Sequence, residues 1–195
     1  ALTDIVFSIM NQGVINTMKL IILDGYSINP GDLSWAPIEA IATFHSYDRS
    51  RQDEIVSRIG DSDGFFVSNC EISRKTMEAC PNLKFIGVTA TGYNHVDIEA
   101  AKELGIAVCH VPAYSTEAVA QHTFALILEL TNLAGRYNAA IQAGRWYKSN
   151  DFTFNAGSLT LLDGKSLGII GYGNIGRRVA RIGEAFGMKI NIYSQ

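Results

Sequence analysis

Three glycines late in the chain have the spacing of a phosphate-binding turn. Gly171, Gly173 and Gly176 form a GxGxxG pattern between an apolar stretch, LGII, and a helical stretch, NIGRRVARIGEAF. The first glycine of such a turn permits the tight bend, the second lets backbone amides approach a pyrophosphate, and the third lets the helix pack closely on the strand. Asn174 and Ile175 would supply the amides at the positive end of the helix. A glycine-rich turn in an ordinary α/β protein is the alternative, but the flanking strand and helix favour dinucleotide binding.

The residue after the next strand bears on which dinucleotide binds. NAD sites place an acidic residue about 20 residues past the turn, where it contacts the ribose hydroxyls. Here the strand MKINIYSQ ends at Ser194, which carries no charge. We expect NAD as the cofactor. NADP or a mixed preference stays open, because Ser194 provides no carboxylate to repel a 2′-phosphate.

A second informative stretch is GVTATGYNHVD, Gly87–Asp97. It leaves an apolar strand, turns through Thr91 and Gly92, and enters a helix that Asp97 caps. Exposed amides after a parallel strand suit a small carboxylate, because ligands bind at the carboxyl ends of such strands. A turn that needs Gly92 only for its backbone angles is an equally supported alternative.

These motifs must be positioned by strands and helices, which alternate along the chain after Met18. The predicted strands are Lys19–Asp24, Ala42–Tyr47, Gly64–Asn69, Lys84–Val88 and Ile106–Val111. The predicted helices are Asp53–Ile59, Ser73–Ala79 and a segment between the cap Asp97 and the terminating Gly105. This alternation predicts an α/β fold whose parallel sheet has helices on both faces.

The pattern changes after the fifth strand. Thr116–Ala143 predicts one long helix that ends at Gly144, followed by a loop over residues 145–164 and then the glycine turn. We place a domain boundary near Ala113–Thr116. Residues 1–17 precede the first clean strand and are interpreted as an N-terminal extension or leader.

Composition narrows the function class. Hydrophobic residues make up 47 % of the 195 residues and charged residues 18 %, which allows a substantial core. The net charge of −3 gives no reason to expect nucleic acid as a partner. Cys70, Cys80 and Cys109 are odd in number and widely spaced, which favours a reducing, cytoplasmic location over a disulfide framework. No apolar run is long enough to predict a membrane span, and no HExxH or CxxC pattern predicts a metal site.

The motifs together identify a family resemblance. GVTATGYNHVD, VPAYSTEAVAQHTFALILEL and DGKSLGIIGYGNIGRRVARIGEAFGMKI, in this order and spacing, resemble the D-isomer-specific 2-hydroxyacid dehydrogenases over about Met18 to Gln195. Within the family, Gln121 and the second of these runs favour the glycerate dehydrogenase (hydroxypyruvate reductase) branch. The resemblance implies a flavodoxin-like substrate-binding domain over 18–113. It also implies the first part of a Rossmann NAD(P)-binding domain over 114–195, with a dimerisation helix and arm.

The resemblance also assigns roles to particular residues. It implies that amides of Thr91 and Gly92 bind the substrate carboxylate, with Thr91 also near the cofactor, and that Asn69 lies on the far side of the substrate. Thr116 would lie near the nicotinamide end or the phosphates of the cofactor. The implied activity is reversible hydride transfer between a nicotinamide and a small D-2-hydroxy acid or 2-keto acid, most nearly D-glycerate and hydroxypyruvate or glyoxylate, in a homodimer.

The resemblance places the catalytic groups of the family outside this sequence. The family's catalytic Arg, Glu and His follow the first Rossmann half, so we expect all three beyond residue 195 and the 195 residues to be a fragment without turnover. The four histidines present are interpreted as structural: His45 and His110 as packing or edge residues of strands, His95 as the cap of a turn beside the substrate loop, and His122 as a residue of the long helix that faces a neighbouring element.

Two other functions are compatible with the same motifs. D-lactate or phosphoglycerate as substrate would use the same chemistry, and a scan of keto acids separates them from hydroxypyruvate. A non-catalytic, NAD-sensing binder similar to a corepressor is the alternative from another class, which downstream catalytic groups would exclude.

Overall fold

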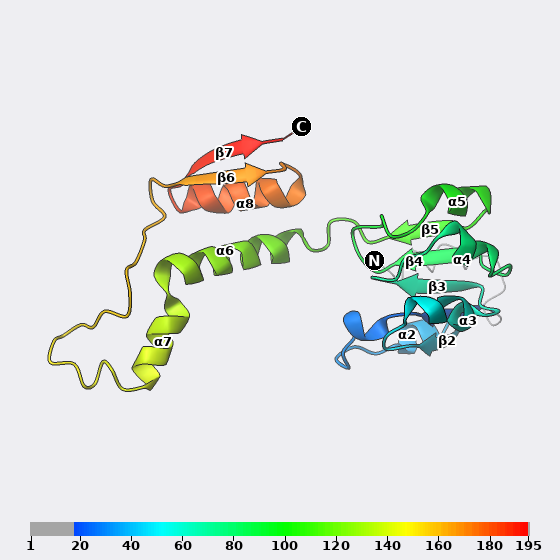
Figure 1. Cartoon of the computed structure of the whole chain (residues 1–195), viewed down its shortest axis with the longest axis horizontal. Helices are drawn as coiled ribbons and strands as arrows, with labels where there is room; N and C mark the ends of the chain where they lie inside the picture. Colours follow the sequence, from blue (N-terminus) through cyan, green and yellow to red (C-terminus); the bar gives the residue numbers. More distant parts are fainter. Residues whose placement is uncertain (1–17, 195) are drawn as a thin grey trace. The chain divides into compact units, whose positions relative to one another are not determined.

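The computed structural model describes residues 18–194, so the predicted extension or leader at residues 1–17, and Gln195, lie outside the described residues. The chain divides into two compact units, the first ending at Pro112 and the second beginning at Ala113. Each unit contains one parallel sheet (Figure 1). This confirms the prediction of an α/β fold with parallel sheets.

Five parallel strands form the sheet of the first unit, in the order β2-β1-β3-β4-β5. The strands are β1 (Lys19–Ile22), β2 (Thr43–Ser46), β3 (Gly64–Val67), β4 (Phe85–Val88) and β5 (Ala107–His110). This order is that of flavodoxin-like folds, with a topological switch point between β1 and β3. All five predicted strands are present, and each is shorter than its predicted range.

Short helices connect these strands. They are the 3₁₀ helices η1 (Gly25–Ser27) and η2 (Gln52–Glu54) and the α-helices α2 (Ala36–Glu39), α3 (Ile55–Ile59), α4 (Arg74–Glu78) and α5 (Ile98–Glu103). The cap predicted for α5 is confirmed, because the Asp97 side chain accepts a hydrogen bond from the amide of Ala100 at 2.9 Å. The helix ends before Gly105, whose φ is +71°. The helices η1 and α2 were not predicted from the sequence.

Side chains alternate across the sheet and bury both of its faces. Ile21 and Leu23 of the first strand region pack with Phe65 in a cluster that includes residues of α3, α4 and α5. Leu20 and Ile22 pack on the opposite face, in a second cluster that includes Ile38 of α2. A strand buried on both faces needs an unbroken apolar run, which explains the composition of KLIILD.

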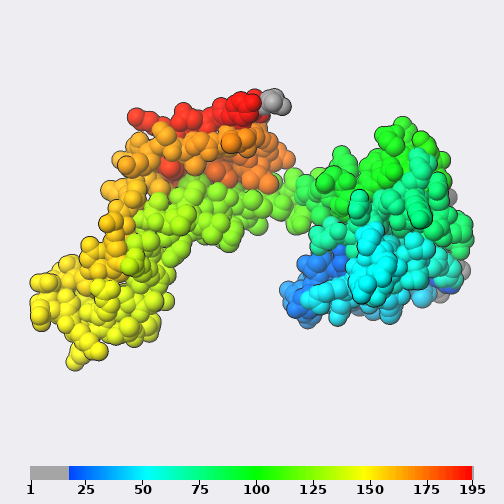
Figure 2. Space-filling view, in the orientation of Figure 1, coloured from blue at the N-terminus to red at the C-terminus, as the bar shows by residue number. Residues whose placement is uncertain are grey.

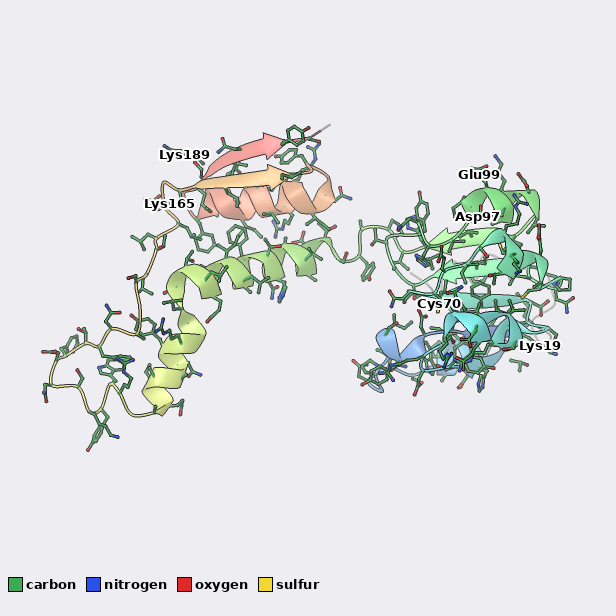
Figure 3. All side chains as sticks on the ribbon, in the orientation of Figure 1. Lys19, Cys70, Asp97, Glu99, Lys165 and Lys189 are labelled. Carbon is green, nitrogen blue, oxygen red and sulfur yellow. The ribbon has the colours of Figure 1, made fainter. Side chains whose placement is uncertain are left out.

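One acidic residue joins three strands at the amino edge of this sheet, where Figure 3 labels Lys19. The Asp63 carboxylate accepts a hydrogen bond from the amide of Lys19 at 2.9 Å and one from Lys84 Nζ at 2.7 Å. Burial acts to raise the pKa of Asp63, but these hydrogen bonds outweigh it, so the pKa lies below the ordinary 3.8. Asp63 therefore ties β1 and β4 to the start of β3.

The second unit pairs a two-stranded parallel sheet with helices. Its elements are α6 (Thr116–Asn132), α7 (Ala134–Gln142), β6 (Ser166–Ile170), α8 (Asn174–Ala185) and β7 (Lys189–Tyr193). The two strands pair from Ser166 opposite Lys189 to Ile170 opposite Tyr193. A single apolar cluster joins α6, α8 and the sheet, with Phe124 and Val179 among its buried members.

The prediction of one helix over Thr116–Ala143 is wrong at its centre. Leu133 takes a left-handed conformation, with φ +55° and ψ 36°, and separates α6 from α7. The Glu129 carboxylate accepts a hydrogen bond from the amide of Gly135 at 2.9 Å and so satisfies one donor at the start of α7. The end of α7 ahead of Gly144, whose φ is +76°, agrees with the prediction.

Residues 145–164 form the predicted loop, which contains neither helix nor strand. Its first part folds back on α7, because the rings of Tyr137 in α7 and Phe154 in the loop lie 5.6 Å apart. Within the loop, Trp146 Nε1 donates to the carbonyl of Phe152 at 3.1 Å. The space-filling view shows the loop and α7 as one continuous body (Figure 2). We call the loop and α7 together the arm.

Candidate functional site

The glycine turn has a different geometry at each of its three glycines. Gly171 has φ +91°, in the left-handed region that favours glycine, and its amide donates to the carbonyl of Tyr193 at 2.8 Å. A Cβ on Gly176 would overlap the carbonyl oxygen of Gly171, so only glycine lets α8 approach the turn. A Cβ on Gly173 would meet no heavy atom within 4 Å. The fold therefore requires glycine at positions 171 and 176. It does not require glycine at position 173, where the missing side chain leaves open space.

That open space lies at the beginning of α8. Gly173 is the N-cap residue and provides no side-chain cap, and Asn174 and Ile175 are exposed. Amides in the first turn of a helix have no acceptor within the helix, and the helix dipole places partial positive charge there. An uncapped, uncrowded helix start of this kind fits the diphosphate of a dinucleotide.

The start of α6 lies at the same end of the second unit. Arg178 Nε donates to the Glu117 carboxylate at 2.6 Å, and farther along the helices the rings of Phe124 and Phe186 stack at 5.4 Å. The two helices therefore run in the same direction (Figure 1). Thr116 is the first residue of α6, and its hydroxyl donates to the carbonyl of Ala113 at 3.1 Å. It shares this end with the beginning of α8.

Ser194 follows the last residue of β7. Its neighbour Tyr193 accepts the hydrogen bond from the amide of Gly171, so Ser194 lies directly beside the glycine turn. This is the position at which a ribose-binding residue is expected in a Rossmann unit.

The predicted substrate residues lie together at the carboxyl edge of the first unit's sheet. Asn69 follows β3, and Thr91 and Gly92 follow β4, which pairs with β3 up to Val67 opposite Val88. Side chains link the two loops, because the hydroxyl oxygens of Ser68 and Thr89 are 2.5 Å apart. Carboxyl ends of adjacent parallel strands are where ligands bind in such sheets.

The backbone conformation at position 92 does not require glycine. Its φ lies outside the left-handed region, and a Cβ there would meet only Asn94 Oδ1, at 3.5 Å, which is ordinary contact. The alternative that this turn needs Gly92 for its backbone angles is therefore wrong. Gly92 is exposed, so the missing side chain leaves its backbone open to approach from outside.

The end of β5 holds the Thr91 turn in place. The Thr91 hydroxyl donates to the carbonyl of Val111 at 3.1 Å, and His110 Nδ1 donates to the carbonyl of Thr91 at 2.9 Å. The Tyr93 ring meets His110 edge-on at 5.0 Å. The sequence interpretation of His110 as a packing or edge residue missed this contact, which only strand pairing reveals.

A buried acid that the sequence analysis did not single out lies beside Asn69. Asp24, just after β1, is 6 % exposed, and its carboxylate accepts the amides of Ser68 and Asn69. The neighbouring Cys70, labelled in Figure 3, is buried. Burial and the nearby Asp24 charge raise the pKa of the Cys70 thiol to about 11. This thiol is therefore protonated near neutral pH and is a poor nucleophile.

The predicted residues thus form two groups in separate units. Asn69, Thr91 and Gly92 belong to the first unit, and the remaining residues, from Thr116 to Ser194, belong to the second. The expectation that Thr91 also lies near the cofactor stays a prediction. Among residues 18–194, no three acidic, histidine or cysteine side chains cluster as metal ligands would. Within the same range, no helix combines the length and apolarity that crossing a bilayer takes.

Comparison with known proteins gives a consistent picture. Residues 22–183 match the model of the "D-isomer specific 2-hydroxyacid dehydrogenase, catalytic domain" family. The chain is similar to a hydroxypyruvate reductase of Blautia hydrogenotrophica, with 44 % identity over 90 % of this chain and 56 % of the relative. It is also similar to a glycerate dehydrogenase of Methylorubrum extorquens, with 31 % identity over 89 % of this chain and 55 % of the relative.

Among solved structures, the chain resembles an acyclic imino acid reductase (Bsp5) in complex with NADPH and D-Arg. The TM-score is 0.71 at 27 % identity, over 90 % of this chain and 55 % of that chain. The chain spans about half the length of these relatives.

Proposed function

The chain belongs to the D-isomer-specific 2-hydroxyacid dehydrogenase family, and from this premise we propose that the protein interconverts hydroxypyruvate and D-glycerate with a nicotinamide dinucleotide. Glyoxylate is a second substrate of the same class. The observation that carries the proposal is the glycine turn, where Gly173 leaves space next to the uncapped start of α8. The choice of substrate is supported by the similarity to hydroxypyruvate reductase and glycerate dehydrogenase.

Each unit would contribute a different part of this function. A bound nicotinamide supplies the redox chemistry, and the protein orients the reactants. In the second unit, the amides of Asn174 and Ile175 would hold the pyrophosphate, with Thr116 at the same end of the unit. In the first unit, the amides of Thr91 and Gly92 would bind the substrate carboxylate, and Asn69 would contact the substrate from the neighbouring loop.

Thr91 binds substrate through its backbone in this proposal. Its hydroxyl and its carbonyl are already engaged by Val111 and His110 within the first unit. These two contacts fix the turn before substrate arrives. A preformed turn loses less conformational entropy on binding, which favours recognition of a ligand as small as a three-carbon acid.

We propose NAD as the preferred cofactor, with NADP also accepted. Ser194 lies beside the glycine turn and offers no carboxylate to repel a 2′-phosphate. The family uses NAD(H) or NADP(H), and the imino acid reductase structure contains NADPH. Ser194 is therefore the position in the described chain that bears on this preference.

We further propose a cytoplasmic homodimer that assembles through α6 and the arm. Large apolar side chains are exposed there, with Leu130 at 78 %, Tyr147 at 93 % and Phe152 at 92 %. Exposed side chains of this size and apolarity favour association. Light scattering of Leu130→Glu should show a monomer, whereas Leu33→Glu, at a residue 63 % exposed in the first unit, should stay dimeric. The mass of a dimer for both variants would exclude α6 from the interface.

The enzymatic proposal is tested with the complete natural protein. Hydroxypyruvate, glyoxylate, pyruvate and 3-phosphohydroxypyruvate are each offered with NADH and with NADPH, and oxidation of the nucleotide is followed by absorbance at saturating nucleotide. The proposal predicts the highest kcat/KM for hydroxypyruvate. A higher value for pyruvate or the phosphorylated acid would replace the proposed substrate. Nucleotide binding without turnover of any keto acid would favour a sensing role.

A further inference from the structure

Asp24 is a buried acidic residue that has no role in the function proposed above. It lies at the carboxyl edge of β1 and is 6 % exposed. No ion pair involves Asp24 within the part of the chain that the structure describes. A buried carboxylate is costly unless hydrogen bonds satisfy it, so a carboxylate kept at this position must be paired with donors.

The donors are two consecutive backbone amides from a distant part of the sequence. Both Asp24 oxygens accept from the amide of Ser68, at 3.0 and 2.9 Å, and Oδ2 also accepts from the amide of Asn69 at 2.7 Å. The acid therefore fixes the backbone of the β3 loop at the two residues where it leaves the strand. Because the amide of Asn69 points to Asp24, the exposed Asn69 carboxamide is the group that this residue can present to a ligand.

The same contact reaches the β4 loop. The hydroxyl oxygens of Ser68 and Thr89 lie 2.5 Å apart, and Thr89 Oγ1 also donates to the carbonyl of Val67 at 3.2 Å. Thr89 precedes Thr91 by two residues. A chain of hydrogen bonds thus runs from Asp24 through Ser68 to the segment that carries the proposed carboxylate-binding amides.

We propose that Asp24 is a positioning residue for substrate binding, which sets the conformation of the Asn69 loop directly and that of the Thr91–Gly92 turn through Ser68 and Thr89. The proposal rests on the proposed function, because it names the residue that prepares the substrate site. Asparagine at this position has one accepting oxygen and one NH₂ group. Even with its oxygen at the Oδ2 position, where it can accept from both backbone amides, the NH₂ group replaces the Oδ1 acceptor 3.0 Å from the amide of Ser68, so one charge-assisted hydrogen bond becomes a donor–donor contact.

The test compares Asp24→Asn with Asp32→Asn, a matched change at an exposed carboxylate of the same unit, in the complete natural protein. Loss of a hydrogen bond to a charged group corresponds to a KM for hydroxypyruvate that is about tenfold higher in Asp24→Asn, with kcat and the Kd for NADH close to the wild-type values. A purely structural role would lower kcat by reducing active protein and would leave KM unchanged. An unchanged KM would overturn the proposal.

Hydrogen exchange measured without substrate separates this inference from the proposed activity. Peptides that cover residues 65–72 and 86–94 should exchange faster in Asp24→Asn by about tenfold, because the loops open more readily, and should not change in Asp32→Asn. If the wild-type protein turned over no keto acid, the proposed function would fail while faster exchange still supported the loop-setting role of Asp24. Unaltered exchange would refute that role whatever the activity. If Asp24→Asn did not fold, Ser68→Ala, which cuts the link to Thr89 and leaves the amides in place, should still raise KM and speed exchange of 86–94. Wild-type values for both would refute the proposal.

Discussion

Replacing Gly173 with alanine tests whether this glycine serves nucleotide binding or the stability of the fold. Gly173 has φ −78° and ψ −160°, an extended conformation that any residue adopts. The added methyl group would meet no heavy atom within 4 Å. The free energy of unfolding should therefore change by no more than about 1 kcal/mol in either direction.

Nucleotide binding should respond very differently. The methyl group would occupy the space through which a diphosphate reaches the amides at the start of α8. Loss of one hydrogen bond to a charged group costs about 1.5–3 kcal/mol, which raises the Kd for NADH or NADPH by about ten- to a hundredfold. Calorimetric titration of the complete natural protein measures the Kd, and urea unfolding measures stability.

Gly176→Ala is the matched control within the same turn. Its methyl group would overlap the carbonyl oxygen of Gly171, so α8 must shift, at a cost of about 1–3 kcal/mol. This variant should lose stability and nucleotide affinity together. The reasoning is refuted if Gly173→Ala binds both nucleotides as well as the wild type does. It is also refuted if Gly173→Ala is destabilised as much as Gly176→Ala.

Three further predictions concern other residues of the two units. Gly92→Ala should keep its stability, because its Cβ would lie 3.5 Å from Asn94 Oδ1, but should raise the KM for hydroxypyruvate about tenfold; an unchanged KM would remove Gly92 from the site. Asp63→Asn should cost about 1.5 kcal/mol near neutral pH. Because the pKa of Asp63 in the folded protein lies below 3.8, its contribution to the free energy of unfolding is present above pH 3.8 and disappears as the pH falls through the folded pKa. The urea midpoints of variant and wild type should therefore converge in acid. A difference between the midpoints that does not change with pH would contradict this assignment. Ser194→Asp should raise the Kd for NADPH more than the Kd for NADH in a titration, because the new carboxylate repels the 2′-phosphate. An equal rise in both Kd values would show that residue 194 does not contact the ribose.

Much of the fold was predictable because its signals are local. The run KLIILD fits a strand with both faces buried, and Asp97 and Gly105 mark the two ends of a helix by capping chemistry. The GxGxxG spacing predicted the turn because the constraints on Gly171 and Gly176 arise within six residues. Strand ends were less predictable, since the last residues of an apolar run, such as Leu23, stay buried beyond the end of the strand. The amide of Leu23 still donates to the carbonyl of Phe66 at 3.1 Å.

Other features depend on contacts that no local pattern reveals. The Asp24 carboxylate accepts from the amides of Ser68 and Asn69, which lie 44 and 45 positions later in the sequence. From the sequence alone, Asp24 therefore resembled an ordinary polar residue at the end of a strand. His110 meets Thr91 only because β5 pairs with β4. The helix break at Leu133 was missed because leucine is a good helix former and gives no turn signal.

The break at Leu133 has an evolutionary consequence. A left-handed leucine costs on the order of 1 kcal/mol, which a glycine there would relieve. However, the Leu133 side chain packs so closely on Gly157 that a Cβ at 157 would come within 2.7 Å of Leu133 Cδ1. The two positions are therefore coupled: a larger residue at 157 requires the Leu133 side chain to move or to be replaced by a smaller one. Descendants of this sequence should exchange the pair together, and a library that randomises both positions at once should recover folded variants that neither single library contains.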